Sequence, residues 1–299
     1  MKSAEGRAWV EPLAILLATG ALLGLTTNLA KVAASWDLAP LPFLAWSVAG
    51  SGLAMLALAG AGGRLPRLDR RRAEYYLAAA LLSVALPNLI FFAAVPRIGA
   101  GFVALVIAFP PLFTYLAAVL LGMERPRIGR ALGVTLALAG AALIALLKLR
   151  QPATANLWVW LALLGPVILA AGNIYRSWRW PPGAEPETLA TGMMATAGLL
   201  LLLAGAWPGV SIAVPIDRPG PLVLILVQAA LFTLQYRLFF RLQKLGGPVY
   251  LSLLGAVGAV AGVPIAVFLL GEAPPDGLAP GAALIGVGIF LLTRGLGRA

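Results

Sequence analysis

The sequence contains no cysteine and no histidine, and charged residues make up only 11% of its 299 positions. Without cysteine there are no disulfides and no thiolate metal sites, and without histidine the usual proton shuttle and the commonest metal ligand are missing. Soluble domains carry about 25% charged residues. Scarce charge, together with 61% hydrophobic residues and a mean hydropathy of +0.94, predicts an all-α, polytopic membrane protein.

Ten apolar runs are long enough to cross the hydrocarbon core as helices, which takes about 20 residues each. The first run is too long for the apolar core of a cleaved signal, so we expect it to be a retained span. Short connections separate the runs and leave no room for a soluble domain. The ten predicted spans are Leu13–Val32, Leu41–Ala61, Tyr75–Val95, Gly99–Leu121, Ile128–Leu147, Trp158–Ser177, Thr188–Trp207, Pro221–Phe240, Gly247–Gly271 and Leu278–Thr293.

Positive residues are distributed unevenly between the two sides of these spans. Of the 22 Lys and Arg residues, 17 fall on the side of the N-terminus. The other five are Lys31, Arg97, Lys148, Arg150 and Arg218. Because cytoplasmic loops collect positive charge, we expect both termini in the cytoplasm. The net charge of +11 lies between apolar runs, so we expect contact with membrane lipid and no nucleic-acid partner.

A motif in the first half of the chain recurs in the second half, 148 positions later. Because each half contains five spans, an odd number, the second half would enter the membrane upside down. We therefore predict two inverted five-helix repeats, residues 1–150 and 151–299, around a central cavity. Each Glu of the motif lies at a helix boundary, where we expect it to cap the helix that follows. The motif residues are Glu124, Pro126, Gly129, Gly133 and Gly140, which recur as Glu272, Pro274, Gly277, Gly281 and Gly288.

None of the eleven Asp and Glu residues lies inside a predicted span. Ionisable groups at mid-membrane mark proton or ion relays, so their absence argues against a proton-driven pump. A membrane enzyme would need clustered His, Asp or Glu for metal or acid–base chemistry. We therefore expect no enzyme activity, no catalytic residue, no metal and no cofactor. Lys31, the one basic residue near the expected cavity, is expected to extend to the membrane interface.

Two predicted spans carry helix-breaking residues at corresponding depths. Pro110 and Pro111 lie near the middle of span four, where proline removes a backbone hydrogen bond and bends the helix. Gly255, Gly258, Gly262 and Pro264 lie at the equivalent depth of span nine. Interrupted segments at matching places in two halves indicate a transport site. The alternative is that Pro and Gly are simply common in membrane helices.

Neutral polar side chains supply the remaining candidates for a binding site. Amides inside hydrocarbon must find partners, so we expect them to face the interior of the bundle. The alternative is that they only join helices. The candidate polar residues are Thr27, Asn28, Asn88, Asn173, Gln228 and Gln235.

The two halves, with Leu-Leu-Gly followed by Glu and Pro at the ends of spans four and nine, resemble the drug/metabolite transporter superfamily. Within it the chain is similar to the EamA family, with repeats at about residues 13–147 and 157–295. The stretches Leu105–Leu112 and Phe91–Ala94 resemble those of the YddG-type exporters of aromatic and other amino acids.

That resemblance implies a cavity that opens alternately to each side, lined by Phe92, Phe109, Pro110 and Tyr236. Relatives that prefer aromatic substrates carry Trp where Phe109 and Leu169 stand here. A smoother apolar wall discriminates less between side chains, so a broad range of amino acids is expected.

These observations predict a monomeric exporter in a bacterial inner membrane. Its substrates would be amino acids over a broad range, including aromatic ones, and related small metabolites, moved by facilitated rather than proton-coupled alternating access. The alternatives are an exporter of drugs or hydrophobic cations, which would want an intramembrane carboxylate, and a nucleotide-sugar carrier, which would need Lys or Arg for phosphate. Two alternatives come from other classes. A membrane enzyme would depend on a catalytic residue, and the sequence offers no candidate for one. A purely structural membrane protein would tolerate Asn88→Ala or Phe109→Ala with transport unaffected.

Overall fold

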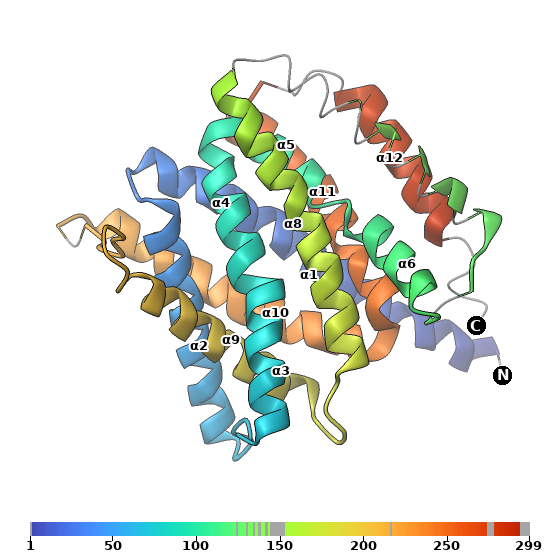
Figure 1. Cartoon of the computed structure of the whole chain (residues 1–299), viewed down its shortest axis with the longest axis horizontal. Coiled ribbons are helices and arrows are strands. Elements are labelled where there is room, and N and C mark those ends of the chain that lie inside the picture. The colour runs from blue at the N-terminus through green and yellow to red at the C-terminus, as the bar shows by residue number, and fades with distance from the viewer. Residues whose placement is uncertain are drawn as a thin grey trace.

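The computed structural model describes residues 2–123, 125–129, 131–133, 135–136, 139–140, 143, 153–215, 217–273 and 278–293, and over these residues the regular structure is helical. Figure 1 shows a helical bundle in which α3 and α4 run in one column and α12 lies along one side. The elements are α1 (Lys2–Ser35), α2 (Pro40–Ala61), α3 (Arg70–Ala80), the π-helical turn η1 (Leu81–Ala85), α4 (Leu86–Ile98), α5 (Ala100–Val106), α6 (Pro110–Leu120), α8 (Ala153–Trp178), α9 (Pro186–Ala204), α10 (Pro219–Ser252), α11 (Leu254–Pro264), the π-helical turn η2 (Ile265–Leu269) and α12 (Leu278–Thr293).

Within the described residues, seven helices are long and apolar enough to cross a membrane, and two further apolar helices are shorter. The seven cover Glu11–Ser35, Pro40–Ala61, Arg70–Ile98, Ala100–Leu120, Leu157–Trp178, Pro186–Ala204 and Pro219–Pro248. Half of the residues of the predicted span Ile128–Leu147 lie outside the described residues. The chain is therefore a multi-pass membrane protein, whereas ten spans in two inverted repeats stay a prediction.

Local sequence explains where several helices begin. Proline is the first residue of α2, α6, α9 and α10, a position whose N–H has no helical acceptor and whose φ proline already favours. Asp69 caps α3, because its Oδ1 accepts the N–H of Arg72 at 2.9 Å. Bilayer-spanning segments must satisfy their own backbone groups, which is why uninterrupted helix dominates the chain.

Glycines allow the closest approaches between helices. α1 packs against α11 and α2 against α9. A Cβ on Gly24 would meet backbone atoms of Gly258 and Gly262, and a Cβ on Gly198 would meet the backbone of Ala49. Helices in lipid associate through such contacts between small residues. The Gly24 contact joins the first span to the broken segment α11, which borders the cavity described below.

Two spans are broken near the middle of the bundle. Residues 107–109 separate α5 from α6, and Leu253 separates α10 from α11. The interruptions predicted within the spans Gly99–Leu121 and Gly247–Gly271 therefore fall at residues 107–109 and at Leu253. Gly99 and Gly247, 148 positions apart, both take left-handed backbone angles (φ 88° and 68°), which favour glycine because it has no Cβ.

Candidate functional site

A cavity of about 60 Å³ lies where the broken spans meet α1, η1, α4, α8 and α10. This volume holds about two water molecules at liquid density. Its lining is mixed, with apolar and aromatic side chains beside amides and hydroxyls. The lining residues are Leu23, Thr27, Ser83, Pro87, Asn88, Phe91, Phe92, Ile107, Pro110, Leu169, Asn173, Gln235, Tyr236, Phe239, Leu251, Ser252, Leu254 and Gly255.

Asn88 and Tyr236 form the polar contact between α4 and α10. Asn88 Nδ2 donates to the carbonyl of Val84 at 2.8 Å and to the Tyr236 hydroxyl oxygen at 3.2 Å. The Tyr236 hydroxyl donates to the carbonyl of Ser83 at 3.4 Å. The Asn88 amide nitrogen and the Tyr236 hydroxyl are therefore both engaged as donors. The side-chain oxygen of Asn88 stays available as an acceptor. Asn88 and Tyr236 are themselves 148 positions apart.

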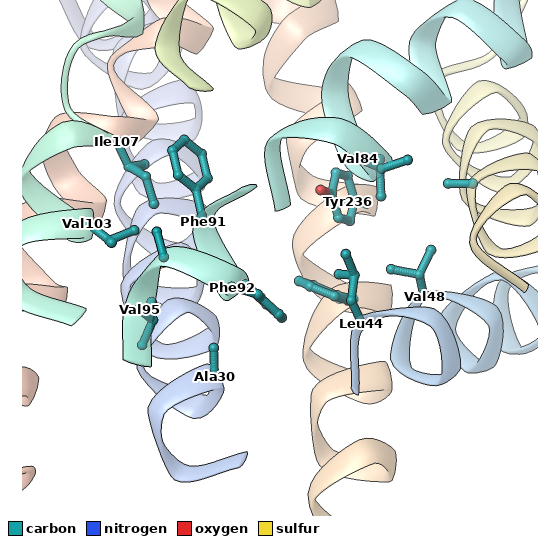
Figure 2. Close-up of a cluster of buried hydrophobic side chains, with 14 of the residues drawn as sticks. Ala30, Leu44, Val48, Val84, Phe91, Phe92, Val95, Val103, Ile107 and Tyr236 are labelled. Carbon is teal, nitrogen blue, oxygen red and sulfur yellow. The ribbon is translucent and has the colours of Figure 1, made fainter. Parts of the chain in front are cut away.

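Aromatic rings line the cavity beside this contact. Phe92 stacks on Phe43 with centroids 5.6 Å apart and lies 6.4 Å from Phe232. Tyr236 lies 5.8 Å from Phe232 and 5.7 Å from Phe239. In Figure 2, Phe91 points toward Ile107, away from Phe92. The rings give one wall that accepts an apolar side chain through dispersion contacts.

A backbone carbonyl is freed at the break in span four. Pro110 and Pro111 have no N–H, so the carbonyls of Val106 and Ile107 lose their helical donors. The Val106 oxygen accepts instead from the N–H of Phe109 at 3.1 Å. The Ile107 oxygen lies against Gly255, where an added Cβ would collide with it. The break thus places an acceptor at the edge of the cavity and requires glycine opposite it.

Arg176 is buried directly behind one wall of the cavity, with no exposed surface. Its Nε donates to Gln243 Oε1 at 2.9 Å and its Nη2 to Asn173 Oδ1 at 2.8 Å. Its Nη1 donates to Ser83 Oγ, and its Cζ lies 4.6 Å from the ring centroid of Phe239. We call these five residues the Arg176 end. Three of the four partners, Ser83, Asn173 and Phe239, line the cavity.

A different arrangement lies at the other end of the helical column formed by η1 and α4. We call its four residues, Lys31, Ala100, Gly101 and Glu272, the Glu272 end. Glu272 accepts the N–H groups of Ala100 at 2.8 Å and Gly101 at 2.9 Å, and binds Lys31 Nζ at 2.9 Å. Burial opposes ionisation of Glu272, but the bonds from Gly101, Lys31 and Ala100 outweigh it, so the pKa of its carboxyl is lowered.

This geometry adds to two expectations. Glu272 caps the N-terminus of α5, in the other half of the chain. Lys31 donates to the carbonyl of Leu270 at 3.2 Å in addition to its pair with Glu272, and its extension to the membrane interface stays a prediction. Glu124, the counterpart of Glu272 in the repeated motif, lies outside the described residues.

Seven of the ten predicted site residues come together around the cavity, and three stand behind its lining. Asn28 donates to the carbonyls of Gly24 at 2.8 Å and Gly262 at 2.9 Å, so it joins α1 to α11. Gln228 donates to the carbonyl of Thr26 at 3.4 Å, and Phe109 is buried in the apolar core. The seven lining residues are Thr27, Asn88, Phe92, Pro110, Asn173, Gln235 and Tyr236.

Arg176 is the residue that reasoning from sequence missed. In the charge count it is one of the 17 Lys and Arg residues on the side of the N-terminus. The available signal was its position three residues after Asn173 on the same helix, since side chains at i and i+3 share a face. An amide directed inward thus implied that Arg176 is also directed inward. Ser83, placed beside it by the π-helical turn η1, carried no such signal.

Comparisons with known proteins agree with a transporter. Residues 12–146 match the model of the EamA-like transporter family, which supports the drug/metabolite transporter superfamily and a small-molecule substrate. A solved structure titled "Crystal structure of protein" superposes with a TM-score of 0.67 at 19% identity, covering 99% of this chain and 100% of that chain. That likeness concerns the fold alone. The comparison with curated proteins gives no match.

Proposed function

We propose that this protein exports amino acids over a broad range, including aromatic ones, and related small metabolites by alternating access. The cavity at the two broken spans carries this proposal, because it pairs a wall of aromatic rings with a wall of amides and hydroxyls. An amino acid presents the same two faces, an apolar side chain and a polar end. The match of residues 12–146 to a transporter family supports movement of a small solute.

Each part of the lining has a proposed role. Phe92 and Tyr236 pack against the substrate side chain, and Asn88, Asn173 and the Ile107 carbonyl bind its polar end. Thr27, Gln235 and Pro110 complete the lining. The three predicted residues that stand behind it, Asn28, Phe109 and Gln228, hold the lining helices in place and do not touch the substrate.

The proposed motion follows from two inverted halves, residues 1–150 and 151–299, that rock against each other. Two pairs support this arrangement, since Gly99 and Gly247 share an unusual backbone conformation and Asn88 contacts Tyr236, each pair at the separation of the repeated motif. With both termini in the cytoplasm of a bacterial inner membrane, the Arg176 end would face the cytoplasm and the Glu272 end the opposite side. The protein would act as a monomer.

Transport is proposed to be facilitated and not coupled to protons. No Asp or Glu is among the described residues that line the cavity, so a carboxylate relay is missing there. Efflux of labelled threonine, methionine or phenylalanine from proteoliposomes should continue when the pH gradient is abolished. Efflux that stops with the gradient would overturn this part of the proposal.

Counterflow of a panel of labelled amino acids in proteoliposomes tests the function itself. Phe92→Ala should slow counterflow of phenylalanine at least about tenfold, since even one methylene of apolar contact in a pocket is worth about 1–3 kcal/mol. Phe268→Ala is the matched control, because Phe268 is 83% exposed on the outer surface of the bundle, and its flux should equal that of the parent. Equal flux in both variants, or no amino-acid counterflow by the parent, would contradict the proposal.

An exporter of hydrophobic cations is the alternative within the same superfamily. The cavity lining lacks a carboxylate among the described residues, and Arg176 behind it would repel a cation. We therefore expect no uptake of a lipophilic cationic dye into the same proteoliposomes.

A further inference from the structure

Arg176 differs from the paired Lys and Arg residues because it has no anionic partner among the described residues. In the described part of the structure, seven Lys and Arg residues pair with Asp or Glu, and all of them are at least 18% exposed. Arg176 is fully buried, yet its hydrogen-bond acceptors are an amide of Gln, an amide of Asn and a hydroxyl. This reverses the usual pattern, in which buried charges are the paired ones.

The guanidinium of Arg176 also has donors to spare. It carries five N–H groups, and three of them have acceptors in the described structure. Phe239 covers one face of the group at 4.6 Å, which stabilises a cation without neutralising it. A positive charge that is desolvated, incompletely bonded and not neutralised attracts an anion strongly, because a buried site screens it less than water does.

The charge of Arg176 reaches the cavity through two of its partners. Ser83 Oγ accepts from Arg176, so its hydroxyl hydrogen is free to donate. Asn173 accepts through Oδ1 at 2.8 Å, so its amide Nδ2 points away from the guanidinium, toward Thr114 Oγ1 at 3.4 Å. Both side chains line the cavity. This wall therefore offers two donor groups, the Ser83 hydroxyl and the second N–H of the Asn173 amide, backed by a full positive charge.

Other parts of the lining offer acceptors instead. The side-chain oxygen of Asn88 and the carbonyl of Ile107 can each accept a hydrogen bond from a bound ammonium group. The cavity lining thus combines a cationic wall with acceptor oxygens. A small zwitterion, with a carboxylate at one end of its polar group and an ammonium at the other, matches this combination.

We propose that Arg176 is the specificity-determining residue that recognises the carboxylate of the transported solute, an inference that rests on the proposed function. A carboxylate that displaced Ser83 Oγ and Asn173 Oδ1 would keep the number of hydrogen bonds to the guanidinium and would add charge pairing. Arginine binds carboxylates in this bidentate manner with fixed geometry. The substrate class is therefore small solutes that carry a carboxylate.

The test uses four compounds that share one aromatic ring and differ in their charged groups. Counterflow of labelled L-phenylalanine in proteoliposomes is challenged with 3-phenylpropionate, which has only a carboxylate, and with phenethylamine and L-phenylalaninamide, which lack it. Unlabelled L-phenylalanine sets the reference. We expect 3-phenylpropionate to compete at least about tenfold better than the two compounds without a carboxylate, the difference a hydrogen-bonded charge supplies.

Variants then assign the preference to Arg176. Arg176→Gln should remove the advantage of 3-phenylpropionate, and Arg176→Lys, which keeps the charge but loses the planar fork, should retain part of it. Arg179→Gln is the matched control, because Arg179 lies three residues on and pairs with Glu74 at 2.9 Å on an exposed surface. This variant should keep the full preference. An unchanged preference in Arg176→Gln would overturn the inference.

The design separates this inference from the proposed function. If the parent protein carries phenylalanine but the amide competes as well as 3-phenylpropionate does, the role of Arg176 is wrong while export of amino acids stands. If no amino acid is carried, export fails, and the shift in thermal unfolding of detergent-purified parent protein still decides between carboxylate and amine. If Arg176→Gln does not elute as a folded protein, the shifts in the unfolding temperature of the parent protein with 3-phenylpropionate and with phenethylamine are compared instead. A larger shift with phenethylamine than with 3-phenylpropionate contradicts the inference.

Discussion

Two cations lie at opposite ends of the column formed by η1 and α4, and only one of them has a carboxylate partner among the described residues. Ser83, which contacts Arg176, and Gly99, beside the Glu272 site, are 16 positions apart, or about 24 Å along a helix. Lys31 has a carboxylate partner in Glu272, whereas Arg176 has neutral acceptors. A neutralised charge holds two segments together, and a charge without a counterion offers a binding site. The Glu272 end is thus built as a structural contact, and the Arg176 end as a place for an anion.

The same contrast appears between the two halves of the sequence. Asn28 and Arg176 are 148 positions apart, the separation of the repeated motif. Asn28 joins α1 to α11 through its amide and leaves its side-chain oxygen without a partner in the described structure. Arg176 replaces that neutral group with a charge. If the halves descend from one repeat, only the second half carries a charge at this position. The cavity therefore has a charged group behind one wall and a neutral one at the corresponding position of the other half.

The largest effect on stability is expected from Glu272→Gln. The change leaves Lys31 without a counterion and weakens the cap on α5, and hydrogen bonds to charged groups contribute about 1.5–3 kcal/mol. Thermal unfolding in detergent should show a loss of that size. Glu74→Gln is the control, because its pair with Arg179 is exposed, and such pairs contribute about 0–1 kcal/mol. Equal losses in the two variants would remove the distinction between a structural and a surface pair.

Acid should weaken the Glu272 end selectively. The folded-state pKa of Glu272 lies below its ordinary value of 4.5, so its contribution to stability is present above the unfolded-state pKa and is lost as the pH falls through the folded-state pKa. The stability gap between the parent and Glu272→Gln, measured by thermal unfolding from pH 7 downward, should therefore close below about pH 4.5.

The corresponding gap for Arg176→Gln should stay constant over the same pH range. The described contacts of Arg176 include no carboxylate, and the chain has no histidine. A gap that also closes in acid would mean that a carboxylate neutralises Arg176 after all.

A smaller loss, about 1 kcal/mol, is expected from Lys31→Gln. Glu272 keeps both of its backbone donors, the N–H groups of Ala100 and Gly101, and the removed ammonium is 30% exposed. Thermal unfolding should rank this variant above Glu272→Gln in stability. The reverse order would show that the lysine, and not the helix cap, holds this end.

The smallest effect is expected for Tyr236→Phe, next to the Arg176 end. The tyrosine hydroxyl makes contacts of 3.2 Å with Asn88 and 3.4 Å with the Ser83 carbonyl, both long for hydrogen bonds that involve a hydroxyl oxygen. Loss of the hydroxyl should lower stability by about 0.5–1 kcal/mol and leave the ring contacts intact. A loss of stability as large as that of Glu272→Gln would show that the contact between Asn88 and Tyr236 stabilises the bundle as much as the Glu272 end does.

The break in span four illustrates how far local chemistry can be followed from sequence. Pro110 and Pro111 lack the N–H groups that two preceding carbonyls need, so an interruption could be predicted, and the structure places it at residues 107–109. Which carbonyl faces the cavity could not be predicted. Phe109 N–H satisfies the Val106 oxygen, and the Ile107 oxygen meets Gly255 of a distant segment. That outcome depends on how α11 docks.

Sequence alone determined that this is a helical membrane protein, because a chain with so little charge must place its apolar runs in lipid and satisfy its backbone internally. It also determined that amides such as Asn88 and Asn173 face the interior, since hydrocarbon offers them no partner. Only the tertiary structure decided the surroundings of Arg176 and Glu272. An arginine at the end of a span looks the same in sequence whether it faces water or neighbouring helices. Burial is a property of packing between segments far apart in the chain, which local patterns do not encode.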